Sequence, residues 1–264
     1  MQTWQQINQK RIPFIKMGEN LFGGMLKEIR RSLLSEIREV ERPQQIPAVL
    51  EYFRFDAPMK EGYERFYART APYFAKDFLN RYKGGKGPVR FKDLDDDLMF
   101  QVIEWVRVNT GKKITAVIQH HYDDIVKVAL RAVETGLGQG WGMDQTAKMI
   151  AQQQGEIDLW KALRIARTET VAASNYGVEL GAEQLPGNKV KVWISSFTTT
   201  SRGARASDNV NHMAMDGQQV GMNDYFTEPM TGDQLLYPGD PNAPTDQIIN
   251  CRCAHEVIIT DEIF

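Results

Sequence analysis

The sequence is poor in cysteine and lacks long apolar runs. Cys251 and Cys253 are the only cysteines among 264 residues, so a framework of several disulfides is excluded and a reducing compartment is favoured. No run approaches the roughly 20 apolar residues that a membrane-spanning helix needs. The first residues lack the continuous apolar core of a secretion signal. With 42% hydrophobic and 25% charged residues, the composition predicts a globular protein without a membrane segment.

Charge is balanced overall but unevenly distributed. The net charge is −2, yet residues 60–92 hold nine Lys and Arg against three acids, whereas residues 207–264 hold ten acids and Arg252 as the one base. A basic segment can face phosphate, and an acidic one repels it. The alternative interpretation is that both charged segments are ordinary faces exposed to solvent. If the basic segment meets DNA, the candidate contacts are Lys83, Lys86, Arg90 and Lys92.

The first two thirds of the chain show the period of amphipathic helices. Apolar residues recur every three to four positions, which predicts helices over 14–40, 58–82, 93–111, 113–135, 144–155 and 158–184. A bend or a break is expected at Gly23–Gly24, a kink or a boundary at Pro72, and a helix end at Gly111. A glycine-rich hinge at 136–142 precedes a helix that Asp144 is expected to cap.

The pattern changes in the last third. Residues 189–196 alternate with period two and predict a strand, 197–250 predict long loops with short helices, and 250–260 predict a closing strand. On that strand Cys251, Cys253 and His255 would share one face. We therefore expect an α+β fold, with a helical region at 1–155 and a loop-rich domain with a small sheet at 156–264.

Five short motifs follow one another in the second half of the chain. They are "ARTETVAASN" (166–175), "KVWISS" (191–196), "HMAMDG" (212–217), "LLYPGDP" (235–241) and "INCRC" (249–253). In this order, over roughly 160–260, they resemble the phage Mu protein F-like domain of phage head morphogenesis proteins. The positions that carry the resemblance are Arg167, Thr168, Glu169, Asn175, Trp193, His212, Asp216, Gly217, Asn250 and Arg252.

Two positions depart from the family pattern. The basic residue usual three positions before the histidine is replaced by Asn209. The aspartate usual soon after the Trp-bearing strand is replaced by the run "TTTS" at 198–201. This chain therefore lacks both side chains of any contact that the basic residue and the aspartate make with each other in the family.

The resemblance implies a structural minor head protein of a tailed phage. Such a protein is implied to bind the portal or the procapsid interior and to assist head assembly and DNA packaging or ejection. It is implied to reside in the virion, at the head interior or the portal vertex, after assembly in the bacterial cytoplasm. The helical region is then a candidate arm for docking on the portal, with other head proteins and double-stranded DNA as further partners.

Polar residues within the helix at 158–184 need partners. Arg167 and Glu169 are two positions apart and face different sides of a helix, so they are not expected to pair with each other. Loops such as 197–250 contain many backbone groups that require hydrogen bonds. We expect Arg167, Glu169 and Asn175 to organise these loops by side chain–backbone hydrogen bonds, which is a structural role.

The cysteines permit two interpretations. Cys251, Cys253 and His212 could hold zinc, with His255 or an aspartate as the fourth ligand, because thiolate and imidazole suit tetrahedral zinc. The spacing is not that of a Cys-x-x-Cys zinc knuckle. The alternative is that both thiols are small buried apolar groups on a strand.

An enzyme is the alternative function. The run "SSFTTTS" downstream of Arg167 is similar to part of the pattern of arginine-type ADP-ribosyltransferases, but that pattern needs a later Glu-x-Glu, and Glu39 and Glu41 lie upstream. A nuclease or hydrolase built on His212, Asp216 and the cysteines is a second enzymatic option. A plain DNA-binding module is disfavoured, because no reader motif is present and the C-terminal third is acidic.

Overall fold

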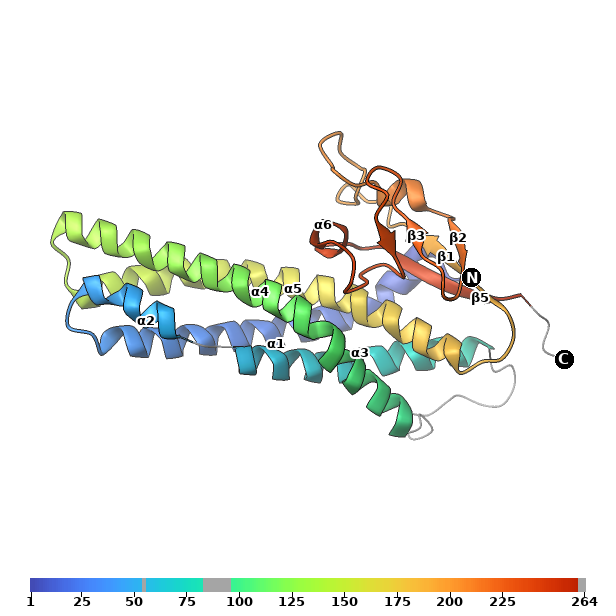
Figure 1. Cartoon of the computed structure of the whole chain (residues 1–264), viewed down its shortest axis with the longest axis horizontal. Coiled ribbons are helices and arrows are strands. Elements are labelled where there is room, and N and C mark those ends of the chain that lie inside the picture. Colours follow the sequence, from blue (N-terminus) through green and yellow to red (C-terminus); the bar gives the residue numbers. More distant parts are fainter. Residues whose placement is uncertain (54–55, 83–95, 261–264) are drawn as a thin grey trace.

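The computed structural model describes residues 1–53, 56–82 and 96–260. Long helices run along one axis, and a small sheet with its loops gathers at one end of them, beside the N-terminus (Figure 1). The connection between α4 and α5 lies at the opposite end. The DNA-contact candidates Lys83, Lys86, Arg90 and Lys92 lie outside the described residues.

Helix α1 spans Trp4–Arg38 and starts with a capping box between Thr3 and Gln6. Of the bend or break expected at Gly23 and Gly24, the break is wrong, because the helix continues through both. A glycine costs a helix only about 1 kcal/mol. The buried apolar stripe on both sides of the pair, including Phe22 and Leu26, offsets that cost.

The other long helices are also longer than the periodicity predicts. After η1 (Pro43–Gln45) and α2 (Ile46–Tyr52), α3 (Asp56–Tyr82) contains Pro72, α4 (Asp96–Gln139) passes Gly111, and α5 (Met143–Glu183) joins the two helices expected at 144–155 and 158–184. The helix end expected at Gly111 is therefore wrong, and of the kink or boundary expected at Pro72 the boundary is wrong. A turn does precede α5, but it is shorter than the glycine-rich segment expected at 136–142, because α4 continues to Gln139; the N-cap of α5 is Gly142, and Asp144 lies in the first turn.

Helix α5 is the central element of the bundle and packs against α1, α3 and α4. It lies very close to α3 at Gly177, where an added Cβ would lie 2.2 Å from the carbonyl oxygen of Ala71. Only glycine therefore fits there. Because α5 crosses residues 155–156 without a break, the domain boundary placed there stays a prediction.

The C-terminal third forms two small antiparallel sheets. Strand β1 (Lys189–Ile194) lies between β2 (Gln219–Gly221) and β5 (Ala254–Ile259), and β3 (Phe226–Thr227) pairs with β4 (Gln234–Leu235). The short helices η3 (His212–Met215) and α6 (Thr245–Ile248) lie among the loops. The predicted α+β class and the strand at 189–196 are confirmed. None of the described helices is long and apolar enough to cross a membrane.

Side chains of α1 and α3 fix the sheet to the bundle. The indole Nε1 of Trp4 donates to the carbonyl oxygen of Arg252 at 2.8 Å, and the hydroxyl of Tyr82 donates to that of Val257 at 2.7 Å. Arg81 pairs with the buried carboxylate of Glu256 on β5. The start of α1 and the end of α3 therefore form the base on which the loop-rich third rests.

Candidate metal centre and its supporting network

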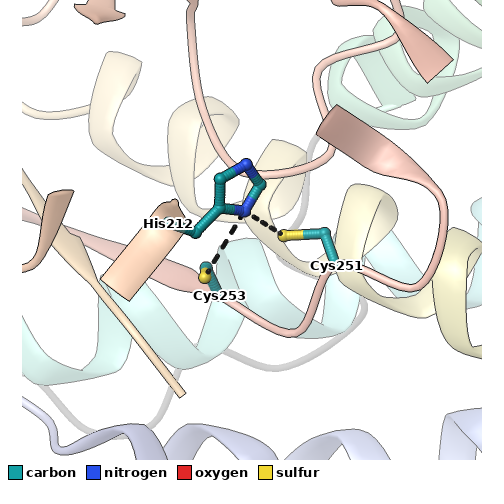
Figure 2. A group of neighbouring side chains, drawn as sticks. All are labelled: His212, Cys251 and Cys253. Carbon is teal, nitrogen blue, oxygen red and sulfur yellow. Dashed lines mark hydrogen bonds between the residues drawn. The ribbon is translucent and has the colours of Figure 1, made fainter. Parts of the chain in front are cut away.

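Three metal-ligating side chains meet in the loop-rich third. His212 opens η3, and Cys251 and Cys253 come just before β5 (Figure 2). The Nδ1 atom of His212 lies 3.5 Å from the sulfur of Cys251 and 3.9 Å from that of Cys253. The three ligand atoms all lie within 4.8 Å of one another. The residues are 0%, 1% and 2% exposed, so the cluster is closed to bulk solvent.

The two thiols differ in their electrostatics. The hydrogen bond from Cys253 lowers the pKa of Cys251, and His212 lowers it further against the opposing effect of burial. The same hydrogen bond, together with burial, raises the pKa of Cys253. Burial alone would lower the pKa of His212, but the neighbouring Cys251 raises it. The cluster thus favours a thiolate at Cys251, the form that binds metal.

A chain of polar side chains orients the ring of His212. Its Nε2 lies 2.7 Å from Oε1 of Gln247, which only accepts, so Nε2 carries the proton and the lone pair of Nδ1 faces the two sulfurs. The amide of Gln247 is held in this orientation because its Nε2 donates to Asp233 at 2.7 Å and to Thr231 at 3.1 Å. Such partners on the second ring nitrogen are usual for zinc-bound histidine.

His255 does not join the cluster. Cys251 and Cys253 precede β5, so the strand alternation that placed all three residues on one face does not apply to them. The ring of His255 points instead to α5, with Nδ1 3.3 Å from Asn175 Oδ1 and Nε2 2.6 Å from Glu179 Oε1, an ion-pair distance without hydrogen-bond alignment. The structure therefore corrects the expectation that His255 is a fourth ligand. No further His, Cys, Asp or Glu of the described residues completes the group.

Asn175 and Arg11 form the network beneath the cluster. The side-chain amide of Asn175 donates to the carbonyl oxygens of Pro238 at 2.7 Å and Cys253 at 3.4 Å, as expected for a residue that organises loops. The guanidinium of Arg11 donates to Ser174, to Asn175 and to the carbonyl oxygens of Arg252 and Cys253. Sequence reasoning missed Arg11. The available signal was a charged residue four positions after buried Ile7, on the inward face of α1.

The other polar residues of the α5 motif divide between three environments. Thr168 Oγ1 accepts from the backbone N–H of Asn250 at 3.0 Å and so holds the cysteine-bearing loop. Glu169 instead accepts from the hydroxyl of Tyr67 at 2.6 Å, inside the helical bundle, so its expected contact with the loops is wrong. Arg167 is half-buried and faces a cavity, and it makes none of the expected side chain–backbone hydrogen bonds with the described residues.

Trp193, Asp216 and Gly217 pack and connect the loops around the cluster. The Trp193 ring is fully buried and forms T-shaped pairs with the rings of His212 and Phe226, at centroid distances of 5.4 and 5.2 Å. Asp216 accepts from the backbone N–H of Ser195 at 2.7 Å. Gly217 donates its N–H to the carbonyl oxygen of Trp193 at 2.9 Å and has a φ of +76°, which favours glycine.

A cavity of about 270 Å³ adjoins the cysteine loop. It is lined by Arg167 of α5, by Arg252 between the two cysteines, and by residues of the loop after β1; the full lining is Arg167, Thr200, Ser201, Arg202, Arg205, Asp208, Asn250 and Arg252. Burial and then the charge of Arg167 lower the pKa of Arg252. Arg167 and the "TTTS" run therefore meet, but Glu39 and Glu41 are absent from this lining.

Comparison with known proteins gives a family match for the second half of the chain. Residues 127–256 match the family model described as phage Mu protein F like protein. This segment belongs to that family. The Mu F-like segment comprises the second part of α4, α5 and almost all of the loop-rich third. Membership indicates a phage head morphogenesis protein.

One curated relative extends beyond the Mu F-like segment. The uncharacterized protein YqbB of Bacillus subtilis (strain 168) is 22% identical over 224 residues, which cover 83% of this chain and 68% of YqbB. The similarity therefore includes much of the helical region as well as the Mu F-like segment. No solved structure gives a significant match.

Proposed function

We propose that the chain is a structural, non-enzymatic minor head protein of a tailed phage that binds the portal or the procapsid interior. The observation that carries this proposal is the family membership of residues 127–256. The architecture supports it, because a loop-rich module pinned by buried side chains sits at one end of a long helical arm (Figure 1). Such an arm, formed by the long helices, suits assembly because its far end, at the α4–α5 connection, presents a surface distant from the sheet and its loops.

The far end of the arm offers a surface for docking on a portal ring. A hollow of about 530 Å³ lies beside the α4–α5 turn and is lined by Trp141, Gln145, Lys148, Met149, Gln152 and Gln153. Leu137, which is 51% exposed, precedes the turn. Tryptophan and methionine are enriched at protein interfaces, and a tryptophan often contributes much of the binding energy.

The test is co-purification of the full-length chain with the portal ring of the same phage. Replacing Trp141 and Met149 with serine should reduce recovery on the ring by about tenfold or more, the effect of losing one interface hot spot. The matched control replaces Tyr225 and Met230, exposed residues of the loop-rich third. Equal recovery of both variants would exclude the arm tip as the docking surface, and no recovery of the wild-type chain would contradict portal binding.

We further propose that His212, Cys251 and Cys253 hold a zinc ion. The supporting observations are the three convergent ligand atoms, the Nδ1 lone pair directed at the sulfurs, and the closed surroundings. An ion there would fix the loop that carries Cys251 and Cys253 to η3. Its role would be structural, because buried thiolates that bind zinc stabilise a small loop-rich fold.

DNA contact is the remaining part of the proposal. The basic residues Lys83, Lys86, Arg90 and Lys92 would meet the phosphate backbone during packaging or ejection, without reading sequence. The enzymatic alternative has no observation in its favour beyond Arg167 and the Thr/Ser run in one cavity. Assays of NAD turnover and nuclease activity, with His212→Ala as a control, should give no activity above background.

A further inference from the structure

The arginine cavity beside the cysteine loop has an unusual charge. Four arginines line it, and Asp208 is the one carboxylate of the lining. Asp208 is already engaged, because its Oδ2 accepts from the backbone N–H groups of Gly203 and Arg205. Among the described residues, none of these four arginines forms an ion pair. Like charges gathered in a cavity repel one another unless an anion joins them.

The arginines gather at this cavity although basic residues are scarce in the surrounding sequence. Residues 197–260 contain many acids, and their only basic residues are Arg202, Arg205 and Arg252. All three line the cavity, and Arg167 reaches the same cavity from α5. A solvated surface would scatter its few basic residues, whereas this fold collects them at one place.

We propose that this cavity is a binding site for a phosphate group. Guanidinium groups bind tetrahedral phosphate oxygens through paired N–H donors, and the hydroxyls of Thr200 and Ser201 add neutral donors to the same lining. The four arginines carry four positive charges, and Asp208, the one carboxylate of the lining, offsets one of them. The remaining positive charge is more than a single carboxylate ligand would neutralise, and it suits a doubly charged phosphate. The acids of the same region oppose a long DNA track, so one phosphate group or a short run of them fits the site.

Two of the arginines are suited to mutagenesis. Arg202 donates to the carbonyl oxygen of Ile249 at 2.7 Å, and Arg252 lies between two proposed zinc ligands, so changing either would disturb the loop itself. Within the part of the chain that the structure describes, the guanidinium groups of Arg167 and Arg205 make no hydrogen bond. The test variant is therefore Arg167→Gln with Arg205→Gln. The control, Arg31→Gln with Arg131→Gln, removes the same charge from exposed helix positions.

The experiment is calorimetric titration of the full-length chain with inorganic phosphate, with ADP and with a short DNA duplex. We expect wild type to bind at least one of them with a dissociation constant below about 1 mM, and the test variant to bind it about tenfold or more weakly. The control variant should bind as wild type does. Unchanged thermal unfolding of both variants will show that loss of binding is not loss of fold.

The three ligands distinguish the sources of the phosphate. Binding of phosphate and ADP without the duplex would assign a terminal phosphate, and competition between the duplex and phosphate would assign a phosphodiester. The inference is wrong if none of the three binds wild type, if the test variant binds them as tightly as wild type does, or if the control variant loses as much affinity as the test variant. Both outcomes are independent of portal binding, which concerns the other end of the molecule.

Discussion

Arg11 and Asn175 are 164 residues apart in sequence, yet Nη2 of Arg11 donates to Oδ1 of Asn175 at 3.0 Å. Both side chains are 1% exposed. Burial lowers the pKa of Arg11 to about 10, with Cys251 and Cys253 opposing the decrease, so the guanidinium is charged at neutral pH. Through this pair, α1 and α5 hold the cysteine-bearing loop, and the helical arm and the Mu F-like segment are physically joined.

Replacing Arg11 with methionine should strongly destabilise the protein. The change keeps the side chain's length but removes the four hydrogen bonds that the buried guanidinium donates to Ser174, Asn175 and the carbonyl oxygens of Arg252 and Cys253, at a cost of about 3 kcal/mol or more in the free energy of unfolding. Urea denaturation measures it. Arg31→Met, at an exposed position on the same helix, should change stability by less than about 0.5 kcal/mol. Equal losses in the two variants would contradict the structural role of Arg11.

Two glycine-to-alanine changes should have opposite effects. At Gly177 an added Cβ would lie 2.2 Å from the carbonyl oxygen of Ala71, so α3 and α5 must separate, at a cost of about 1–3 kcal/mol. At Gly24 nothing lies within 4 Å of an added Cβ, and alanine should stabilise α1 by up to about 1 kcal/mol. Thermal unfolding of the two variants tests both signs. A destabilising Gly24→Ala would argue against the uninterrupted α1.

The stability of the loop-rich third should depend on Glu228 at acid pH. Burial alone would raise the pKa of Glu228, but hydrogen bonds from Asn211, Thr231 and Met230 hold it below its ordinary value of 4.5. A carboxylate whose pKa is lowered in the folded state stabilises the fold at pH values above its ordinary pKa of 4.5. This contribution is lost as the pH falls through the pKa that the group has in the folded state.

Glu228→Gln tests this dependence. The difference in unfolding free energy between wild type and variant should be largest near neutral pH and should shrink as the pH falls below 4.5. Denaturation at a series of pH values measures it. Glu134→Gln, at an exposed position of α4, supplies the comparison. A difference that stays constant across the acid range would show that Glu228 acts without its charge.

Zinc content tests the proposed metal centre. Purified wild type should contain about one zinc per chain, and a strong chelator should lower its unfolding temperature. Cys251→Ser and Cys253→Ser should lose the ion, whereas Gln247→Ala should weaken its affinity by about 10–100-fold because His212 loses its orienting partner. Asp246→Asn, an exposed neighbour, should retain it. Less than about 0.2 zinc per chain, with stability insensitive to chelator, would rule out the metal.

Duplex binding tests the basic segment. Replacing Lys83, Lys86, Arg90 and Lys92 with glutamine should weaken binding to every duplex sequence alike, and should reduce the slope of log affinity against log salt by about three to four. Fluorescence anisotropy at several salt concentrations measures both quantities. A charge-matched variant at Lys27, Arg31, Arg131 and Lys148 should retain binding. Absence of wild-type affinity even near about 50 mM salt would refute the DNA contact, while portal binding could still hold.

The local pattern of the sequence determined the secondary structure and the family. Apolar spacing located the long helices, period-two alternation located β1, and the ordered motifs identified the Mu F-like segment, because these features depend on neighbouring residues. Helix ends were less predictable. Gly23, Gly24 and Gly111 lie inside helices because burial of an apolar face outweighs the weak preference of a single residue.

Only the tertiary structure decided the partners of the buried polar groups. Glu169 meets Tyr67, His255 turns to α5, and Arg11 supports the cysteine loop, although no local pattern connects these positions. The grouping of His212 with Cys251 and Cys253 was one of two interpretations of the sequence, and the fold brings these residues together across about 40 residues. A buried charge or hydrogen-bonding group is stabilised by whatever the fold places beside it, and that neighbour is set by the packing of distant segments.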